Sequence, residues 1–199
     1  MKELKNYAAW TFHNTWVTIV SYIFSKFVLF LLLFIHGSFG FSMAEDRTYF
    51  SNPLPICIMG FVLALGTGIL QRELLKEYFK ISFFWVLSLI IGFVIAESIA
   101  GIVLWKMEIY RGLINVFNKD VHFTESLIFG LAGLISGILQ VRLLKPYYNK
   151  RFYWIISSTL GWAIFILLAY MSVFGIILGA VFYGAITGIA FYKLLEPKT

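Results

Sequence analysis

Residues 152–192 form a long stretch without a single Asp, Glu, Lys, Arg or His. A membrane-spanning helix needs about 20 mostly apolar residues, so this stretch has room for two. Across the 199-residue chain, 60% of residues are hydrophobic and 13% are charged, whereas soluble domains carry roughly 25% charged residues. A soluble fold of this size has too much surface for its volume to hide such a composition. The sequence therefore predicts an all-α integral membrane protein with a single membrane domain over residues 1–199.

Apolar segments recur along the chain and predict about six membrane-spanning helices. Their expected bounds are 16–35, 55–70, 83–105, 126–139, 152–171 and 173–192. Residues 1–15 mix Lys, Trp, His and Asn with small apolar residues, which indicates a short interfacial segment or a lead-in to the first span. Only short loops remain between the spans, so no soluble domain is expected.

The basic residues are unevenly divided between the loops. Most of the 16 Lys and Arg residues fall in segments that are cytoplasmic if the N-terminus is cytoplasmic. Loops rich in Lys and Arg are retained on that side of the membrane. We therefore expect both termini in the cytoplasm, and we attribute the formal charge of +6 to topology rather than to nucleic-acid binding.

Residues 65–92 align without gaps to residues 134–161, and nearly half of the aligned positions are identical. The identical pairs include Gly68 with Gly137, Gln71 with Gln140 and Trp85 with Trp154. Apolar bias alone does not place such residues in register, so the sequence predicts a duplicated two-helix unit. The two hairpins, 55–105 and 126–171, run in the same direction, which makes the repeat parallel. The last span, 173–192, is expected to begin a partial third copy that closes a ring with the first span.

Small residues follow one face of the second, fourth and sixth spans. They include Gly68, Gly133, Gly137, Gly184 and Gly188. Small residues four apart let helix backbones approach closely in lipid. We expect these three spans to pack together at the centre, with the more aromatic first, third and fifth spans facing lipid.

Gln71 and Gln140 end the glycine-bearing faces of the second and fourth spans. A buried amide needs hydrogen-bond partners. One interpretation is an interhelical hydrogen bond, and the other is a polar ring around a cytoplasmic entrance.

Trp85 and Trp154 open the third and fifth spans beside basic residues. Tryptophan is enriched at membrane–water interfaces, so we expect both to be interfacial anchors. Stacking against a ligand is the alternative.

Two charged residues fall inside predicted spans. Lys26 lies within the first span and Glu97 within the third, where the aligned position of the second repeat is Ile166. Charge inside a membrane is costly and marks functional positions by default. The alternatives are that Lys26 extends to the membrane surface and that Glu97 marks the outer end of its span.

Polar residues also gather at the expected outer edges of the spans. His36 and His122, with Glu97, Asp120 and Glu125, are candidates for an outer metal or proton site. Because no metal-ligand spacing connects them, we predict no metal and no cofactor. No catalytic motif is present either, so we expect a protein that is not an enzyme, with a lipid-modifying activity as the remaining alternative.

The hairpin pattern G-I-L-Q-x-x-L-L-K-x-Y, followed by an aromatic–Trp pair, resembles a repeat in uncharacterised bacterial membrane proteins, many of them cyanobacterial. The likeness covers residues 65–92 and 134–161 and implies a bacterial inner or thylakoid-type membrane. Size and span count also look like the substrate-binding subunits of energy-coupling-factor vitamin transporters. The first span lacks the Ala-x-x-x-Ala pattern of that family.

Two functional hypotheses follow. The first is a non-catalytic subunit that packs against or regulates a larger membrane complex, with the bilayer and other membrane subunits as partners. The second is a small-molecule transporter, or its membrane binding component, with its route lined by Lys26, Glu97, Gln71 and Gln140.

Overall fold

The computed structural model describes residues 2–38, 54–109, 121–144 and 151–195, and these residues form six α-helices. The helices are α1 (Lys2–Ser38), α3 (Leu54–Lys76), α4 (Phe84–Ile109), α6 (Val121–Leu144), α7 (Phe152–Met171) and α8 (Val173–Leu195). The prediction of an all-helical chain is confirmed for this part of the chain, and α7 has the predicted bounds.

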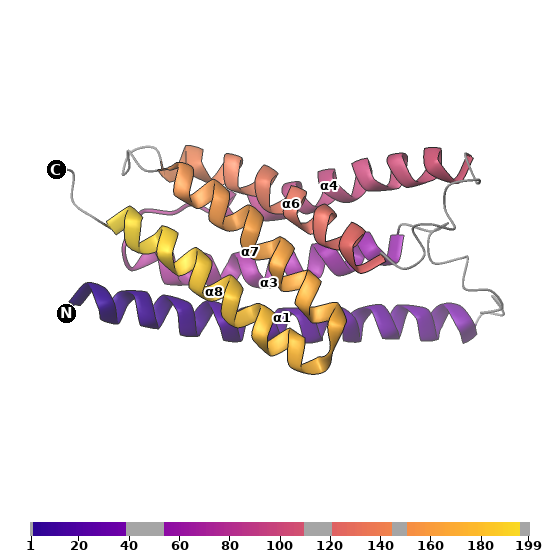
Figure 1. The fold of residues 1–199 in the computed structure, drawn as a ribbon, viewed down its shortest axis with the longest axis horizontal. Coiled ribbons are helices and arrows are strands. Elements are labelled where there is room, and N and C mark those ends of the chain that lie inside the picture. The colour runs from indigo at the N-terminus through magenta and orange to yellow at the C-terminus, as the bar shows by residue number, and fades with distance from the viewer. Residues whose placement is uncertain (1, 39–53, 110–120, 145–150, 196–199) are drawn as a thin grey trace.

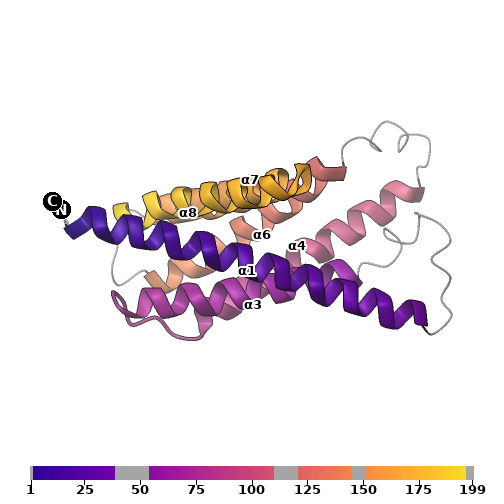
Figure 2. The same cartoon turned by 90° about the horizontal axis from the view of Figure 1, so that it is seen from below.

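The helices are arranged in a ring, in which each helix packs against its two neighbours (Figures 1 and 2). The order around the ring is α1, α3, α4, α6, α7 and α8, and α8 packs against α1. The expectation that the second, fourth and sixth spans form a central group is wrong, because α3, α6 and α8 alternate around the ring with α4, α7 and α1. Every helix therefore contributes one face to the interior.

The first helix begins and the last helix ends at the same end of the bundle (Figure 1). We call this the N/C end, where α1 and α7 begin and α3, α6 and α8 finish, and we call the other the far end. The α3–α4 link also lies at the N/C end, where Phe79 and Ile81 are buried against Leu75 and Trp85.

The first helix is continuous through residues expected to form a short interfacial segment or a lead-in to the first span. Residues 2–15 belong to α1, and Trp10 and Asn14 are buried in the bundle. Of the two expectations, the lead-in agrees with this continuous helix, in which Trp10 and Asn14, one helical turn apart, turn the same face toward α8. With 37 residues, α1 is about 55 Å long, well beyond the roughly 30 Å of a bilayer core.

Three of the helices have described stretches long and apolar enough to cross a membrane by length and composition. They are Glu125–Leu144, Arg151–Met171 and Val173–Leu194. The described apolar stretch of α4, Phe84–Ile99, is shorter. All six helices present bulky apolar side chains outward: Phe27, Phe61, Val94, Leu127, Leu160 and Val181 are examples, one from each helix. A lipid environment satisfies such a surface, whereas water does not.

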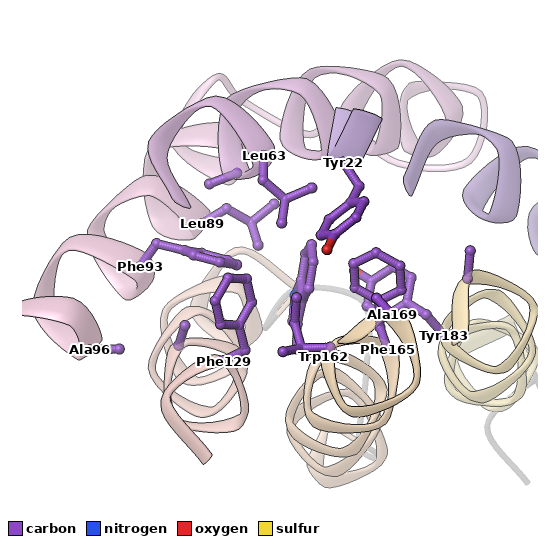
Figure 3. Packing of buried hydrophobic residues seen from close by; sticks show 14 residues of the cluster. Tyr22, Leu63, Leu89, Phe93, Ala96, Phe129, Trp162, Phe165, Ala169 and Tyr183 are labelled. Atoms are coloured by element: carbon purple, nitrogen blue, oxygen red, sulfur yellow. The ribbon is translucent and has the colours of Figure 1, made fainter. Parts of the chain in front are cut away.

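Aromatic side chains fill the centre of the bundle (Figure 3). Trp162 of α7 is fully buried, and its ring lies within about 5 Å of the rings of Phe93 and Tyr183. Phe129 packs edge-on against Phe93, at 5.1 Å between ring centroids. These contacts connect α4, α6, α7 and α8 through one tryptophan.

A serine forms the tight connection between α7 and α8. The Ser172 hydroxyl accepts a hydrogen bond from the Gly175 backbone N–H at 2.9 Å, which caps the start of α8. Gly175 lies against the Leu168 carbonyl, where a Cβ atom would overlap backbone. Glycine at this position allows α8 to turn back directly along α7.

Candidate functional site

The first buried polar group lies toward the N/C end and is centred on Gln71. We call it the glutamine network; its members are Trp10, Asn14, Gln71, Trp85, Tyr183 and Thr187. The Gln71 amide nitrogen donates to the Asn14 side-chain oxygen at 3.1 Å and to the Tyr183 hydroxyl at 2.8 Å. Gln71 thus joins α3 to α1 and α8, which is the interhelical bonding that one interpretation of the sequence expected.

A threonine completes this network on α8. The Thr187 hydroxyl accepts hydrogen bonds from the Asn14 amide at 3.1 Å and the Trp10 indole at 3.3 Å. It donates to the Tyr183 backbone carbonyl at 2.8 Å. All of these side chains are at most 2% exposed. Each hydrogen bond therefore replaces one that the polar group would otherwise make with water.

The aligned glutamine, Gln140, has fewer partners. Its side-chain oxygen accepts a hydrogen bond from the Trp154 indole at 2.9 Å, as the Gln71 oxygen does from Trp85 at 3.4 Å. The Gln140 amide nitrogen is buried and has no hydrogen-bond partner among the described residues. The two glutamines therefore share one contact and differ in the rest.

The expected interfacial position of Trp85 and Trp154 is wrong. Trp85 is fully buried, Trp154 is 1% exposed, and their ring centroids lie 5.2 Å apart inside the bundle. Trp10 packs edge-on against Trp154 at 6.0 Å. Their indole N–H groups find glutamine or threonine partners, and this lets tryptophan occupy an interior position.

The glycines contact the next helix of the ring. An added Cβ atom would lie 3.2 Å from the Val86 backbone at Gly68, and 3.2 Å from the Ile155 backbone at Gly137. Val86 and Ile155 each follow the tryptophan of their hairpin.

Three further predicted packing glycines behave in the same way. Gly133 lies against Ser158 of α7, and Gly184 and Gly188 lie against Thr11 of α1. The glycine faces therefore close the α3–α4, α6–α7 and α8–α1 pairs rather than a group at the centre.

The second polar group lies toward the far end, is partly buried and contains charge. We call it the charged cluster; its members are Tyr22, Lys26, Glu97, Glu125 and Tyr170, from α1, α4, α6 and α7. The Lys26 ammonium lies 5.3 Å from the centre of the Tyr22 ring and 4.9 Å from that of Tyr170, both within cation–π range. Glu125 interacts electrostatically with Lys26, and its carboxylate accepts a hydrogen bond from the Tyr170 hydroxyl.

Glu97 faces the inside of the bundle and is 5% exposed. Its Oε1 atom has no hydrogen-bond partner among the described residues and lies near Gly60 of α3, 3.7 Å from where a Cβ atom would stand. The electrostatic neighbours of Glu97 are Glu125, a like charge, and Tyr170. Because α4 continues to Ile109, Glu97 lies within the helix and not at its end.

The surface at the N/C end carries ordinary charge pairs. Glu73 contacts Lys76 at 2.7 Å and Arg72 at 2.9 Å, and the hydrogen bond from Lys76 lowers the pKa of the Glu73 carboxyl. Burial raises the pKa of Tyr78 in the α3–α4 link. An open depression of about 440 Å³, lined by residues 76–81 of this link alone, joins neither polar group.

Several of these residues escaped prediction. Asn14, Tyr183 and Thr187 were not singled out, and neither were Tyr22 and Tyr170. Pairs four residues apart carry a usable signal, because they share a helix face. Such pairs are Trp10 with Asn14, Tyr183 with Thr187, and Tyr22 with Lys26.

The outer metal or proton site falls only partly within the described residues. Asp120 and the side chains of His36 and His122 lie outside them. Within them, no group of three or more His, Cys, Asp or Glu residues is arranged to hold a metal ion. Comparisons of this chain with protein families, curated proteins and solved structures found no match.

Proposed function

We propose that this chain is a non-catalytic membrane protein that binds a small polar ligand at the charged cluster, as a transporter or as the binding component of one. The observation that carries the proposal is Glu97, a buried carboxylate with an oxygen that has no hydrogen-bond partner among the described residues and with a second carboxylate, Glu125, as an electrostatic neighbour. Glu97 and Lys26 both come from the polar set that the sequence nominated. Gln71 and Gln140 belong to the other end of the bundle and are not part of this site.

The free-energy cost of placing charged side chains inside the bundle supports this proposal. Charged side chains inside a bilayer are expensive, face the bundle interior and mark ligand or ion pathways. Lys26 and Glu125 partly offset each other, and two tyrosine rings face the ammonium group. Glu97 has no such compensation among its described neighbours, so a bound ligand is the missing partner.

The proposal includes six spans, with both termini in the cytoplasm of a bacterial inner or thylakoid-type membrane. Basic residues of α3, α6, α7 and α8 lie at the N/C end, and the positive-inside rule favours that end as cytoplasmic. The far end, with the charged cluster, then faces outward. The resemblance to bacterial membrane proteins supports the choice of membrane.

The proposal also retains the parallel repeat. The Trp–Gln hydrogen bond occurs at aligned positions in two hairpins, and the glycine contacts of Gly68 and Gly137 match as well. The α8–α1 pair has Gly188 against Thr11, which follows Trp10, so this pair is the third unit. The N-terminal helix then supplies the half that the partial third copy lacks.

Thiol labelling tests the ligand site without knowledge of the ligand. Cys57 is the chain's one cysteine, so Cys57→Ser gives a thiol-free background. In that background Glu97→Cys is expected to react with a membrane-impermeant cationic thiol reagent added outside. Ile166→Cys is the matched control, because Ile166 is the aligned, fully buried position in the second hairpin. Equal protection of both cysteines from either side would contradict a ligand site.

A second candidate function is a subunit that packs against or regulates a larger membrane complex. The dense aromatic centre around Trp162 favours this candidate. Ring contacts of Trp162 with α4, α6 and α8 fill the described core between these helices and α7, where a transport route would need space. Native extraction in lipid nanodiscs tests this candidate. A particle of constant composition with a second membrane protein supports it, and a 22.9 kDa chain that always runs alone contradicts it.

A further inference from the structure

The charged cluster has an imbalance of charge. It contains two carboxyl groups, Glu97 and Glu125, and one ammonium group, Lys26. The Lys26 ammonium is engaged by Glu125 and by the faces of two tyrosines. With both carboxyl groups ionised, the described residues of the cluster carry one more negative charge than positive charge.

The surroundings of Glu97 locate this excess charge. The titratable groups that interact electrostatically with Glu97 are Glu125 from α6 and Tyr170 from α7, and Lys26 of α1 packs against the Tyr170 ring. From α3, Gly60 lies near the Glu97 carboxylate and brings no charge. A buried ion without a partner is strongly disfavoured, so Glu97 requires a positive charge.

We infer that the charged cluster binds one exchangeable positive charge, a proton or a monovalent metal ion, held by the Glu97 carboxylate. The inference rests on the proposed function and deepens it, because it names the class of ligand. A proton forms a covalent O–H bond on Glu97 and leaves as H⁺ when the site opens to water. A metal ion takes the same place by displacing that proton.

Such a site couples a conformational change of the protein to an ion gradient. The protein then has one conformation in which the cluster is open to one side of the membrane and another in which it is not. A positive charge that binds only in the open conformation changes the relative stability of the two conformations. The ion gradient then biases the change between them.

Infrared difference spectroscopy of the full chain in lipid nanodiscs tests the inference. The readout is the carbonyl stretch of a protonated carboxyl group, followed as pH rises in a buffer with N-methylglucamine as its only cation. Wild type is expected to show the band at neutral pH, and Glu97→Gln to lose it. Glu73→Gln is the control and retains the band, because Glu73 is exposed and paired with Lys76.

Two further arms identify the ion and the role of Lys26. A band that weakens when Na⁺ or K⁺ replaces N-methylglucamine at constant pH identifies a metal ion that exchanges with the proton. An unchanged band identifies the proton alone. Lys26→Met is expected to about double the band, because Glu125 then also needs a proton, whereas Lys26→Arg leaves it unchanged.

The inference is overturned if wild type shows no such band at any pH at which it stays helical, with or without Na⁺ and K⁺. It is also overturned if the band persists in Glu97→Gln. If Glu97→Gln fails to fold, Glu97→Asp replaces it and is expected to shift the band without removing it; an unshifted band counts against the inference. Thiol labelling is a separate readout, so a water-accessible site without this band rejects the ion and keeps the proposed function.

Discussion

The two polar groups of this bundle differ in their charge and in how their polar atoms are paired. The glutamine network is neutral, and its central amide makes three hydrogen bonds to side chains of α1, α4 and α8. The charged cluster has an ammonium, two carboxyl groups and a carboxylate oxygen without a partner. A neutral network with all of its hydrogen bonds formed holds helices in register. Charged groups without full pairing cost free energy inside a membrane, and their presence there is typical of a functional site.

A reciprocal exchange of the two central residues would break this comparison most strongly. Gln71→Glu places a carboxylate against the Asn14 oxygen and removes both amide donations, so we expect a loss of about 3 kcal/mol of unfolding free energy. Glu97→Gln removes a buried charge at similar shape, and we expect a change within about 1 kcal/mol. Unfolding in bicelles measures both; a larger loss in Glu97→Gln would reverse the assignment of structural and functional roles.

A bulky side chain at Gly184 of α8 is expected to disrupt the packing of α8 against α1, which the glutamine network spans. A Cβ atom at Gly184 would lie 2.6 Å from the Thr15 hydroxyl and 2.7 Å from the Thr11 carbonyl, so Gly184→Leu forces α8 away from α1. We expect a loss of about 2–3 kcal/mol. The lipid-facing change Ile189→Leu is the control and is expected to be neutral. A tolerated Gly184→Leu would mean that α8 and α1 do not close the ring.

The two aligned glutamines, Gln71 and Gln140, differ in the number of their hydrogen-bond partners. Gln71→Leu leaves the groups on Asn14, Tyr183 and Trp85 unpaired, and we expect a cost of about 2 kcal/mol. Gln140→Leu unpairs only the Trp154 indole and removes an amide nitrogen that has no partner, so we expect a cost below about 1 kcal/mol. The same bicelle assay compares them. Equal losses of unfolding free energy in the two variants would show that the hydrogen bonds of Gln71 to Asn14 and Tyr183 contribute nothing to stability.

The smallest effect is expected at the exposed Glu73. Its pKa is lowered in the folded protein by the hydrogen bond from Lys76, so its contribution to stability is present above the unfolded pKa of about 4.3. That contribution is lost as pH falls through the folded pKa. Glu73→Gln should remove this small acid-sensitive component of the unfolding curve and leave the neutral-pH curve nearly unchanged, because the pair is open to solvent. A large change at neutral pH would contradict this view of the surface charge.

Sequence alone predicted the helical class, the bounds of α7 and the glutamine and charged positions around which both groups form. It failed for the directions in which side chains point. These helices are apolar on every face, so no amphipathic pattern distinguishes lipid from interior. Trp85 and Trp154 were therefore placed at the interface, although the structure buries both.

The partners of the central residues depend on contacts between distant parts of the chain. Asn14 reaches Gln71 because α1 packs against α3, and it reaches Thr187 because α8 closes the ring on α1. Lys26 meets Tyr170 in the same way, through the approach of α1 to the end of α7. Spacing within one helix nominates such faces, and tertiary packing decides which of them meet.

Paired thiol labelling tests the difference between the two groups most directly. In the Cys57→Ser background, Glu97→Cys and Gln71→Cys place one thiol in the charged cluster and one in the glutamine network. A charged, membrane-impermeant reagent added from outside should modify Glu97→Cys and leave Gln71→Cys unmodified, since water reaches only the group that binds a ligand. Faster labelling of Gln71→Cys, or complete protection of Glu97→Cys, would contradict the assignment of the charged cluster as the site of function.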